Sequence, residues 1–466
     1  MRSLLLAGLL LFIGILQASG ESDSTDLVII DCISLEGNRI TRPNIILREL
    51  RFSIGDTLTS QMLTASLKGS RDNVFNTSLF NVVELDTVRL SSLPTRVEVI
   101  VKVIERWYIW PIPYIEFPNR NVNAWLETFD FRNLTYGLNL KFFNARGRNE
   151  TLTLLLHFGF NQQYGFTYRT PYINKKQTLG FGFGGKYSQN RSLITGTTGN
   201  KSNYLDTARG NLRQRAHGFI EGYFRPNLYS YHTLALGYDY YRFADTLLKI
   251  PGYLTDSTNG QSFFTIYYKY KLDHRDVQYY PLRGWYFDLE LTKHGFTDEP
   301  VNLFLIQSAF RKYWKFTERW FLAAGTTVRW SWPEEQPFFL QHGIGYGRDI
   351  IRGFEYYSII GSWFGLVKTN LKFALIKPRT AKLSFIRSPK FGVIPYGLYL
   401  NLFVDAGYVN NSVSYVKQDN FLVNTFLAGY GLSIDFVTYY DIVLDLNFAL
   451  NSMGEPGIYI HFTAPI

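Results

Sequence analysis

The sequence of 466 residues contains one cysteine, Cys32, so an intramolecular disulfide bond is excluded. After residue 20 no stretch approaches about 18 consecutive apolar residues, which excludes a membrane-spanning helix from that part of the sequence. There is no G-x-S-x-G nucleophile elbow, and the seven histidines form no H-E-x-x-H or other metal-binding pattern. We therefore expect no enzyme activity, no metal and no cofactor.

Aromatic residues and glycines, in contrast, are plentiful. Aromatic side chains make up 17% of the chain, with 33 tyrosines and 38 phenylalanines, and there are 38 glycines. This composition is unusual for two or three soluble domains of the same total length. The formal net charge is +10, and an exported basic chain is expected to meet anionic lipid rather than nucleic acid.

The N-terminal segment has the pattern of a secretory signal peptide. Arg2 precedes an apolar run over residues 4–16, and the small residues Ala-Ser-Gly follow at 18–20. The run is short for a membrane span, and the small-x-small pattern is typical of a cleavage site. We predict that residues 1–20 are a signal peptide and that the rest of the chain is exported.

Residues 27–107 combine strand and helix patterns in the order β-α-α-β-β, which predicts a small α+β domain. Thr41, which lies before Pro43, and Ser60 are candidate N-caps of the two helices. The last strand of this domain alternates cleanly, with valines at 97, 99, 101 and 103.

From about residue 110 to residue 466, helical periodicity disappears and apolar positions alternate with polar ones. In the stretch 264–273, apolar and aromatic residues occupy one face, whereas Lys269, Lys271 and Asp273 fall on the other. Long apolar faces of this kind are typical of transmembrane β-barrels, whose strands must close into a ring because hydrocarbon satisfies no backbone group. A soluble β-sandwich or propeller is the alternative, but it would not keep charge off one face in strand after strand. At about 22 residues per strand and loop, the region predicts an all-β transmembrane barrel of about 16 antiparallel strands.

Stretches from both regions resemble one known family, in the same order along the chain. The first region is similar to a POTRA domain, the periplasmic polypeptide-transport-associated module, through "LEGNRITRPNIILREL", "NTSLFNVVEL" and "RVEVIVKVIE". The second is similar to the barrel of outer-membrane protein assembly factors of the BamA/TamA type, through "LDHRDVQYYPLRGWYFDLEL", "QPFFLQHGIGYGRDIIRGFEYYSIIG" and "FVDAG". The resemblance implies one POTRA domain over residues 27–107, followed by the barrel over residues 110–466.

In that family a long extracellular loop folds back into the barrel lumen, and its R-G-F/Y tip meets an F-x-D-x-G strand. The resemblance therefore implies contact between two groups, the loop tip Arg352, Gly353 and Phe354 and the inner-wall motif Phe403, Asp405 and Gly407. The alternation of its strand independently turns Asp405 inward, because a carboxylate that faces lipid is costly. A guanidinium opposite this carboxylate can make two parallel hydrogen bonds. Such a pair fixes the position of the loop rather than adding stability, because desolvation offsets much of the Coulomb attraction.

The C-terminal stretch "EPGIYIHFTAPI" fits the strand signal that outer-membrane barrels present to their insertion machinery. Four residues carry that pattern, Glu455, Gly457, Ile460 and Phe462. The last strand is expected near residues 455–466 and the first near residues 114–122. Pro113 and Pro118 would limit hydrogen bonding at the first strand, since proline has no backbone donor.

The family resemblance implies a function at the bacterial outer membrane, with the POTRA domain in the periplasm. The chain is expected to assist insertion or translocation of unfolded outer-membrane or secreted polypeptides, in contact with outer-membrane lipid and with accessory subunits. Central insertases carry several POTRA domains, whereas this sequence has room for one. An accessory structural barrel that anchors partners in a larger complex is therefore the alternative. A diffusion porin would lack both the POTRA domain and the inward loop.

Overall fold

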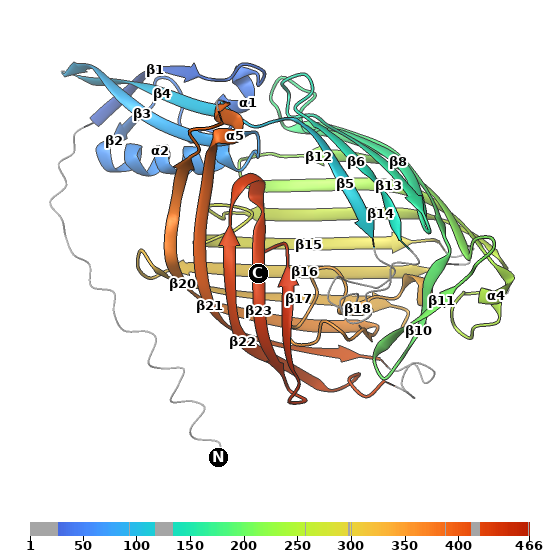
Figure 1. The fold of residues 1–466 in the computed structure, drawn as a ribbon. Coiled ribbons are helices and arrows are strands. Elements are labelled where there is room, and N and C mark those ends of the chain that lie inside the picture. Colours follow the sequence, from blue (N-terminus) through green and yellow to red (C-terminus); the bar gives the residue numbers. More distant parts are fainter. Residues whose placement is uncertain are drawn as a thin grey trace.

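The computed structural model describes residues 27–92, 94–116, 134–256, 258–296, 299, 301–386, 388–411, 420–464 and 466. The predicted signal peptide lies outside these described residues. Within the same ranges no helix is long and apolar enough to cross a membrane. Figure 1 shows a small α+β unit beside one end of a large strand-built body.

The α+β unit is a four-stranded sheet with strand order β2-β1-β4-β3, in which β1 and β4 run parallel. Its core joins Ile30, Val99 and Val101 of the sheet to Ile46 and Val74 of the helices. This agrees with the predicted α+β order, to which the structure adds one short strand. The elements are β1 (Leu27–Glu36), α1 (Pro43–Leu47), β2 (Thr57–Thr59), α2 (Ser60–Phe75), β3 (Phe80–Ser92) and β4 (Thr95–Glu105).

Both predicted helix caps of this unit are wrong. The side chain of Thr59, not Ser60, accepts a hydrogen bond from the backbone N–H of Met62 at the start of α2. Thr41 does not cap α1; it is buried, and its hydroxyl lies 3.0 Å from the hydroxyl of Tyr108. Thr41, which the local sequence would assign to capping, therefore contacts Tyr108 instead.

Beyond this unit, the residues that the structure describes form a main sheet of 16 strands, in which successive wall strands pair with each other, so the predicted fold class is confirmed. The first eight strands in chain order are β5 (Ile109–Glu116), β6 (Thr135–Phe143), β7 (Thr151–Gly159), β8 (Gln162–Thr170), β9 (Leu179–Asn190), β12 (Arg213–Phe224), β13 (Ser230–Phe243) and β14 (Gly260–Asp273). The last eight are β15 (Gly284–His294), β16 (Leu303–Lys315), β17 (Trp320–Trp332), β20 (Trp363–Lys382), β21 (Val393–Asn410), β22 (Phe426–Val437), β23 (Val443–Asn451) and β24 (Pro456–His461).

Short elements lie in the connections between these strands. Two small hairpins form sheets of their own, β10 (Ser192–Thr198) with β11 (Lys201–Asp206) and β18 (Gly343–Ile344) with β19 (Ile359–Ile360). The helical turns are α4 (Asp245–Leu248), α5 (Pro389–Gly392), η1 (Phe338–Leu340) and η2 (Tyr439–Asp441).

Side chains alternate between two environments along the barrel strands. On β21, Leu402 and Val404 are about half exposed, whereas Phe403 and Asp405 between and beside them are buried. The outer face is therefore apolar and the carboxylate lies inside, as the alternation pattern predicted. This arrangement suits a wall with hydrocarbon outside and a polar lumen within.

Candidate functional site

The connection between β17 and β20 carries the predicted loop tip. β18 and β19 pair near the two ends of this connection and hold the residues between them as a closed loop. Ile351, Arg352 and Phe354 are all buried, with at most 1% of each residue exposed. The loop tip therefore lies inside the molecule and not on its surface.

The structure brings Arg352 and Asp405 together. The guanidinium Nε donates to Asp405 Oδ2 at 2.8 Å and Nη2 donates to Oδ1 at 2.5 Å. The backbone N–H of Arg352 also donates to Asp405 Oδ2, at 3.1 Å. One carboxylate thus fixes both the side chain and the backbone of the loop tip. Breaking a buried pair of this kind costs about 3–5 kcal/mol, because the charge that stays behind has no partner.

Two further groups contact the guanidinium of Arg352. Its central carbon lies 3.8 Å from the centroid of the Phe403 ring, within cation–π distance. Nη2 also donates to Asn370 Oδ1 on β20, at 2.7 Å. Nη1, in contrast, is buried without a hydrogen-bond partner among the described residues. The inner walls of two neighbouring strands therefore hold the arginine, and one of its donors remains available.

Gly353 makes the tight turn that follows the arginine. Its φ is +96°, in the left-handed region that favours glycine. Its carbonyl accepts a hydrogen bond from Asn451 Nδ2 on β23, at 3.0 Å. Its N–H donates to Glu355 Oε2 at 2.8 Å. The turn thus ties the loop tip to a third strand of the wall.

Where the loop passes the wall, the wall strands carry glycines in place of larger side chains. A Cβ on Gly429 of β22 would lie 1.8 Å from the carbonyl oxygen of Arg352, and one on Gly407 would lie 2.7 Å from Ile351 Cδ1. Gly407 belongs to the predicted wall motif, whereas sequence reasoning missed Gly429. Phe354 packs into an apolar cluster that includes Ile344 of the loop. The backbone of the loop therefore approaches the backbone of the wall strands directly, with no side chain between them at Gly429.

The four residues of the predicted C-terminal signal have different surroundings. Glu455 accepts hydrogen bonds from the Tyr357 hydroxyl, 3.0 Å from each carboxylate oxygen, so it anchors the lumenal loop. Gly457 lies beside the ring of Tyr459, which a Cβ would overlap. Ile460 is half-buried in β24, and Phe462, just past the strand end, is 62% exposed. The loop contact of Glu455 could not be read from the terminal pattern.

The α+β unit is attached to the barrel turns by two ion pairs, one buried and one partly buried, that sequence reasoning also missed. Arg225, in the turn after β12, donates to both carboxylate oxygens of Glu49, at 2.5 and 2.7 Å. Although burial opposes its charge, Glu49 raises the pKa of Arg225. Arg106 makes a second two-pronged pair with Asp441, at 2.8 and 2.9 Å. These contacts hold the unit against one end of the barrel.

At the other end of the barrel, the β10–β11 hairpin reaches across to distant segments. Its tip residue Asn200 is fully buried. The backbone N–H of Asn200 donates to Asn420 Oδ1 at 2.8 Å, and its side-chain oxygen accepts from the N–H of Leu422 at 2.9 Å. Its carbonyl accepts from the N–H of Ser358 in the lumenal loop, at 2.7 Å. The hairpin thus connects the β9–β12 side of the wall to the β21–β22 connection.

The 16-stranded sheet ends at β5 and β24, and no backbone pairing joins these two strands among the described residues. β5 begins at Ile109, so the prediction of 114–122 placed the first strand too late; residues 117–122, with Pro118, lie outside the described part. The last strand falls where it was expected. Over the described ranges, no group of three or more His, Cys, Asp or Glu side chains is arranged to hold a metal ion.

Comparison with known proteins agrees with this architecture. Residues 144–462 match the Omp85 superfamily domain, and residues 28–106 match a POTRA domain described as a surface antigen variable number repeat. No curated protein matches the sequence of this chain.

One solved structure supports the fold, and two more distant matches are found beside it. BamA from Haemophilus ducreyi lacking POTRA domains 1–3 is similar at 16% identity and a TM-score of 0.52, over 93% of this chain and 83% of that chain. CdiB from Acinetobacter baumannii and CdiB from Escherichia coli match at 12% and 11% identity, each with a TM-score of 0.46. Those two matches cover 94% and 96% of this chain and 74% and 92% of the CdiB chains. Because the family domain spans more than half of the sequence, the chain belongs to the Omp85 superfamily.

Proposed function

We propose that the protein assists the insertion or translocation of other polypeptides at the bacterial outer membrane. The observation that carries this proposal is the seam between β5 and β24, whose edges are not paired with each other in the described chain. An unpaired strand edge presents backbone donors and acceptors to any extended segment, which can add to it as a further strand. On this proposal residues 1–20 direct export, residues 27–107 form the periplasmic domain and residues 110–466 form the barrel.

The direction of backbone groups on β5 can be derived from one hydrogen bond. The carbonyl of Tyr108 accepts from the N–H of Phe143, at the start of the β5–β6 pairing. Because backbone groups alternate sides along a strand, even-numbered residues of β5 face β6 and odd-numbered residues face the seam. Pro111 and Pro113 therefore occupy seam-facing donor positions, and neither has an N–H to offer. This edge keeps only the donors of Ile109 and Ile115.

The edge of β24 is interrupted in the same way. The carbonyl of Glu455 accepts from the N–H of Asn451 on β23, so odd-numbered residues face β23 and even-numbered residues face the seam. Pro456 is thus a third proline at a seam-facing position. Prolines on both edges weaken direct pairing of β5 with β24, which supports a seam that a client strand can enter.

In the proposed mechanism the loop tip supports the last strands while the seam exchanges partners. Arg352 is bonded to the walls of β20 and β21, and Gly353 to β23. Tyr357 reaches Glu455, directly before β24. The loop therefore braces one side of the seam from within, and the residues of the R-G-F and F-D-G motifs act by position and not by chemistry on a client.

Depletion of the protein followed by quantitative outer-membrane proteomics tests the proposal. Loss of many barrel proteins indicates general assembly, and loss of a few outer-membrane or secreted proteins indicates a dedicated client set. Unchanged levels of all other proteins in the depleted membrane would contradict insertion and translocation alike.

The second candidate function is an accessory barrel that anchors partners in a larger complex. It is favoured by the fixed attachment of the single POTRA unit through the Arg225–Glu49 and Arg106–Asp441 pairs. A rigidly held unit suits docking of a partner as well as delivery of a client. Co-purification of a stable partner together with an unchanged proteome would support the anchor.

A further inference from the structure

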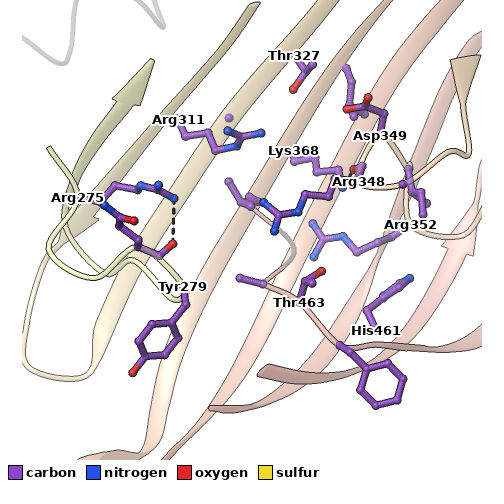
Figure 2. Close-up of a pocket in the computed structure, with 18 of the residues that line it drawn as sticks. Arg275, Tyr279, Arg311, Thr327, Arg348, Asp349, Arg352, Lys368, His461 and Thr463 are labelled. Carbon is purple, nitrogen blue, oxygen red and sulfur yellow. Dashed lines mark hydrogen bonds between the residues drawn. The ribbon is translucent and has the colours of Figure 1, made fainter. Parts of the chain in front are cut away.

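A cavity of about 170 Å³ lies inside the barrel, between its inner wall and the lumenal loop. Its walls come from separate parts of the chain, namely β16, β17, β20, the loop tip and the residues that follow β24. At one end it reaches the turn after β14, where Asp276 contacts the POTRA unit through a hydrogen bond from Asn76. We call this space the lumenal cavity. Figure 2 shows the side chains that surround it.

Positive charge exceeds negative charge around the lumenal cavity. Arg311 of β16, Arg348 of the loop and Lys368 of β20 line it, as does one carboxylate that none of the ion pairs above uses, Asp349. Arg311 and Arg348 form no ion pair with any residue that the structure describes, and Figure 2 shows both beside Lys368. The nearby charge of Arg275 is already balanced, because Arg275 pairs with Asp273 at 2.7 Å. Among the described residues, Arg311 and Arg348 therefore bring two cations without ion pairs to the cavity, beside Lys368 and the carboxylate of Asp349.

A buried donor without a partner provides a second, independent observation. Arg352 lines the lumenal cavity, is 1% exposed, and its Nη1 lacks a hydrogen-bond partner among the described residues. The other two guanidinium nitrogens are committed to Asp405 and Asn370. Leaving a buried charged donor unpaired is unfavourable, so an acceptor in the cavity would relieve that cost. An oxygen atom with negative charge is the acceptor that such donors bind best.

We propose that the lumenal cavity is a binding site for an oxyanion, either a carboxylate or a phosphate group. Arg311, Arg348 and Lys368 supply the charge, and Nη1 of Arg352 supplies a hydrogen bond. The bound group bridges two wall strands and the loop, so it stabilises the loop tip in its lumenal position. The volume suits one such group with a few waters. The ligand is either a free anion such as inorganic phosphate or an acidic side chain of a polypeptide in the lumen.

Phosphorus NMR of inorganic phosphate, titrated with the full-length protein in micelles of an uncharged detergent, tests this site directly. The phosphate resonance is expected to broaden with wild-type protein. The double variant Arg311→Ala/Arg348→Ala is expected to weaken binding by about tenfold or more, since each charged hydrogen bond contributes about 1.5–3 kcal/mol. Arg348→Gln alone, at an exposed loop position, provides a weaker variant whose folding is not at risk.

Lys312→Ala is the matched control, because Lys312 is the next residue on β16 and its side chain points to the opposite face. It removes one positive charge, as each of the two arginine substitutions does, and should leave phosphate binding unchanged. A tetraglutamate peptide that displaces phosphate at much lower concentration identifies polypeptide carboxylates as the ligand, whereas failure to displace it identifies a small anion. The proposal is overturned if wild type and the double variant broaden the resonance equally, or if neither broadens it. This result is independent of client insertion, so it can fail while the proposed function stands.

Discussion

At the scale of single residues, Arg352 organises contacts to three strands. Its side chain bonds Asp405 on β21 and Asn370 on β20, and the next carbonyl along the chain accepts from Asn451 on β23. Neither lysine nor a neutral side chain can make this set, because the planar guanidinium supplies two parallel donors together with a third direction. The arginine therefore specifies one position of the loop.

Replacement of Arg352 by alanine should release the loop while the barrel still assembles. The buried carboxylate of Asp405 loses its partner, and the cost of about 3–5 kcal/mol should favour expulsion of the loop tip from the lumen. Heat-modified mobility of the folded barrel and client levels in the outer membrane measure the two effects. The double reversal Arg352→Glu/Asp405→Arg should recover part of what either single reversal loses. A double variant no better than the single variants would contradict direct pairing.

Glu355 gives the loop a dependence on pH. It lies in the loop, outside the spanning strands, and burial raises the pKa of its carboxyl from an ordinary 4.5 to about 7, although His461 and the N–H of Gly353 favour the charged form. Because the folded pKa is above the unfolded one, this group's stabilising contribution is complete below pH 4.5 and is lost as pH rises through 7. The free energy of unfolding that depends on this carboxyl is on the order of 3 kcal/mol.

The variant Glu355→Gln should therefore lose this pH dependence. Wild type should become less stable than Glu355→Gln when the buffer is changed from about pH 5 to about pH 8, as measured by the midpoint of heat-modified mobility. Glu335→Gln, an exposed position in the same connection, is the control and should follow wild type. Parallel curves for wild type and Glu355→Gln would show that the buried carboxyl does not titrate as described.

At the scale of elements, the strands were predictable and their contacts across the lumen were not. Lipid forbids an outward carboxylate, so the alternation alone placed Asp405 inside. The first strand was placed too late, since β5 already includes Pro111 and Pro113. Their missing donors face the seam and interrupt no hydrogen bond to β6. Asn200 sits in a turn sequence that carries no information about a partner more than 200 residues away. Gly429 was missed because a close approach of two backbones leaves no periodic pattern.

Restoring donors to the seam tests the role of the prolines in β5. The double variant Pro111→Val/Pro113→Val adds two seam-facing N–H groups, which should let β5 pair with β24 and stabilise the barrel by roughly 1–3 kcal/mol. Client delivery should fall as the barrel becomes more stable, because a β5 edge that is paired with β24 cannot pair with a client strand. Ile112→Val changes the same strand without changing a donor and serves as the control. Unaltered stability together with normal delivery would count against a seam held open by proline.

At the scale of the whole molecule, the POTRA unit and the barrel are one assembly. Ion pairs join them at two barrel turns, a buried one between Arg225 and Glu49 and a partly buried one between Arg106 and Asp441. A partly buried pair, Arg283 with Asp72 at 2.8 Å, adds a third attachment. Three separated attachments fix both position and orientation, whereas one would act as a hinge.

The variant Glu49→Ala should loosen this attachment, because Arg225 is left buried without its carboxylate at a cost of about 3–5 kcal/mol. Spin-label distances between the POTRA unit and the barrel should broaden relative to wild type. Asp31→Ala is the control, since Asp31 pairs with Arg96 on the exposed surface of the same unit. An unchanged distance distribution for Glu49→Ala would show that the remaining contacts suffice.

The crossing hairpin β10–β11 separates two exit routes for a client. A chain that travels along the barrel axis must displace this hairpin, whose tip residue Asn200 is hydrogen-bonded to Asn420 and Ser358. A chain that leaves sideways into the lipid does not meet the hairpin. A covalent bridge between the hairpin tip and residue 420 would therefore arrest export to the cell surface and spare lateral release. The location of the client in the bridged variant, at the cell surface or in the membrane, thus distinguishes secretion from membrane insertion.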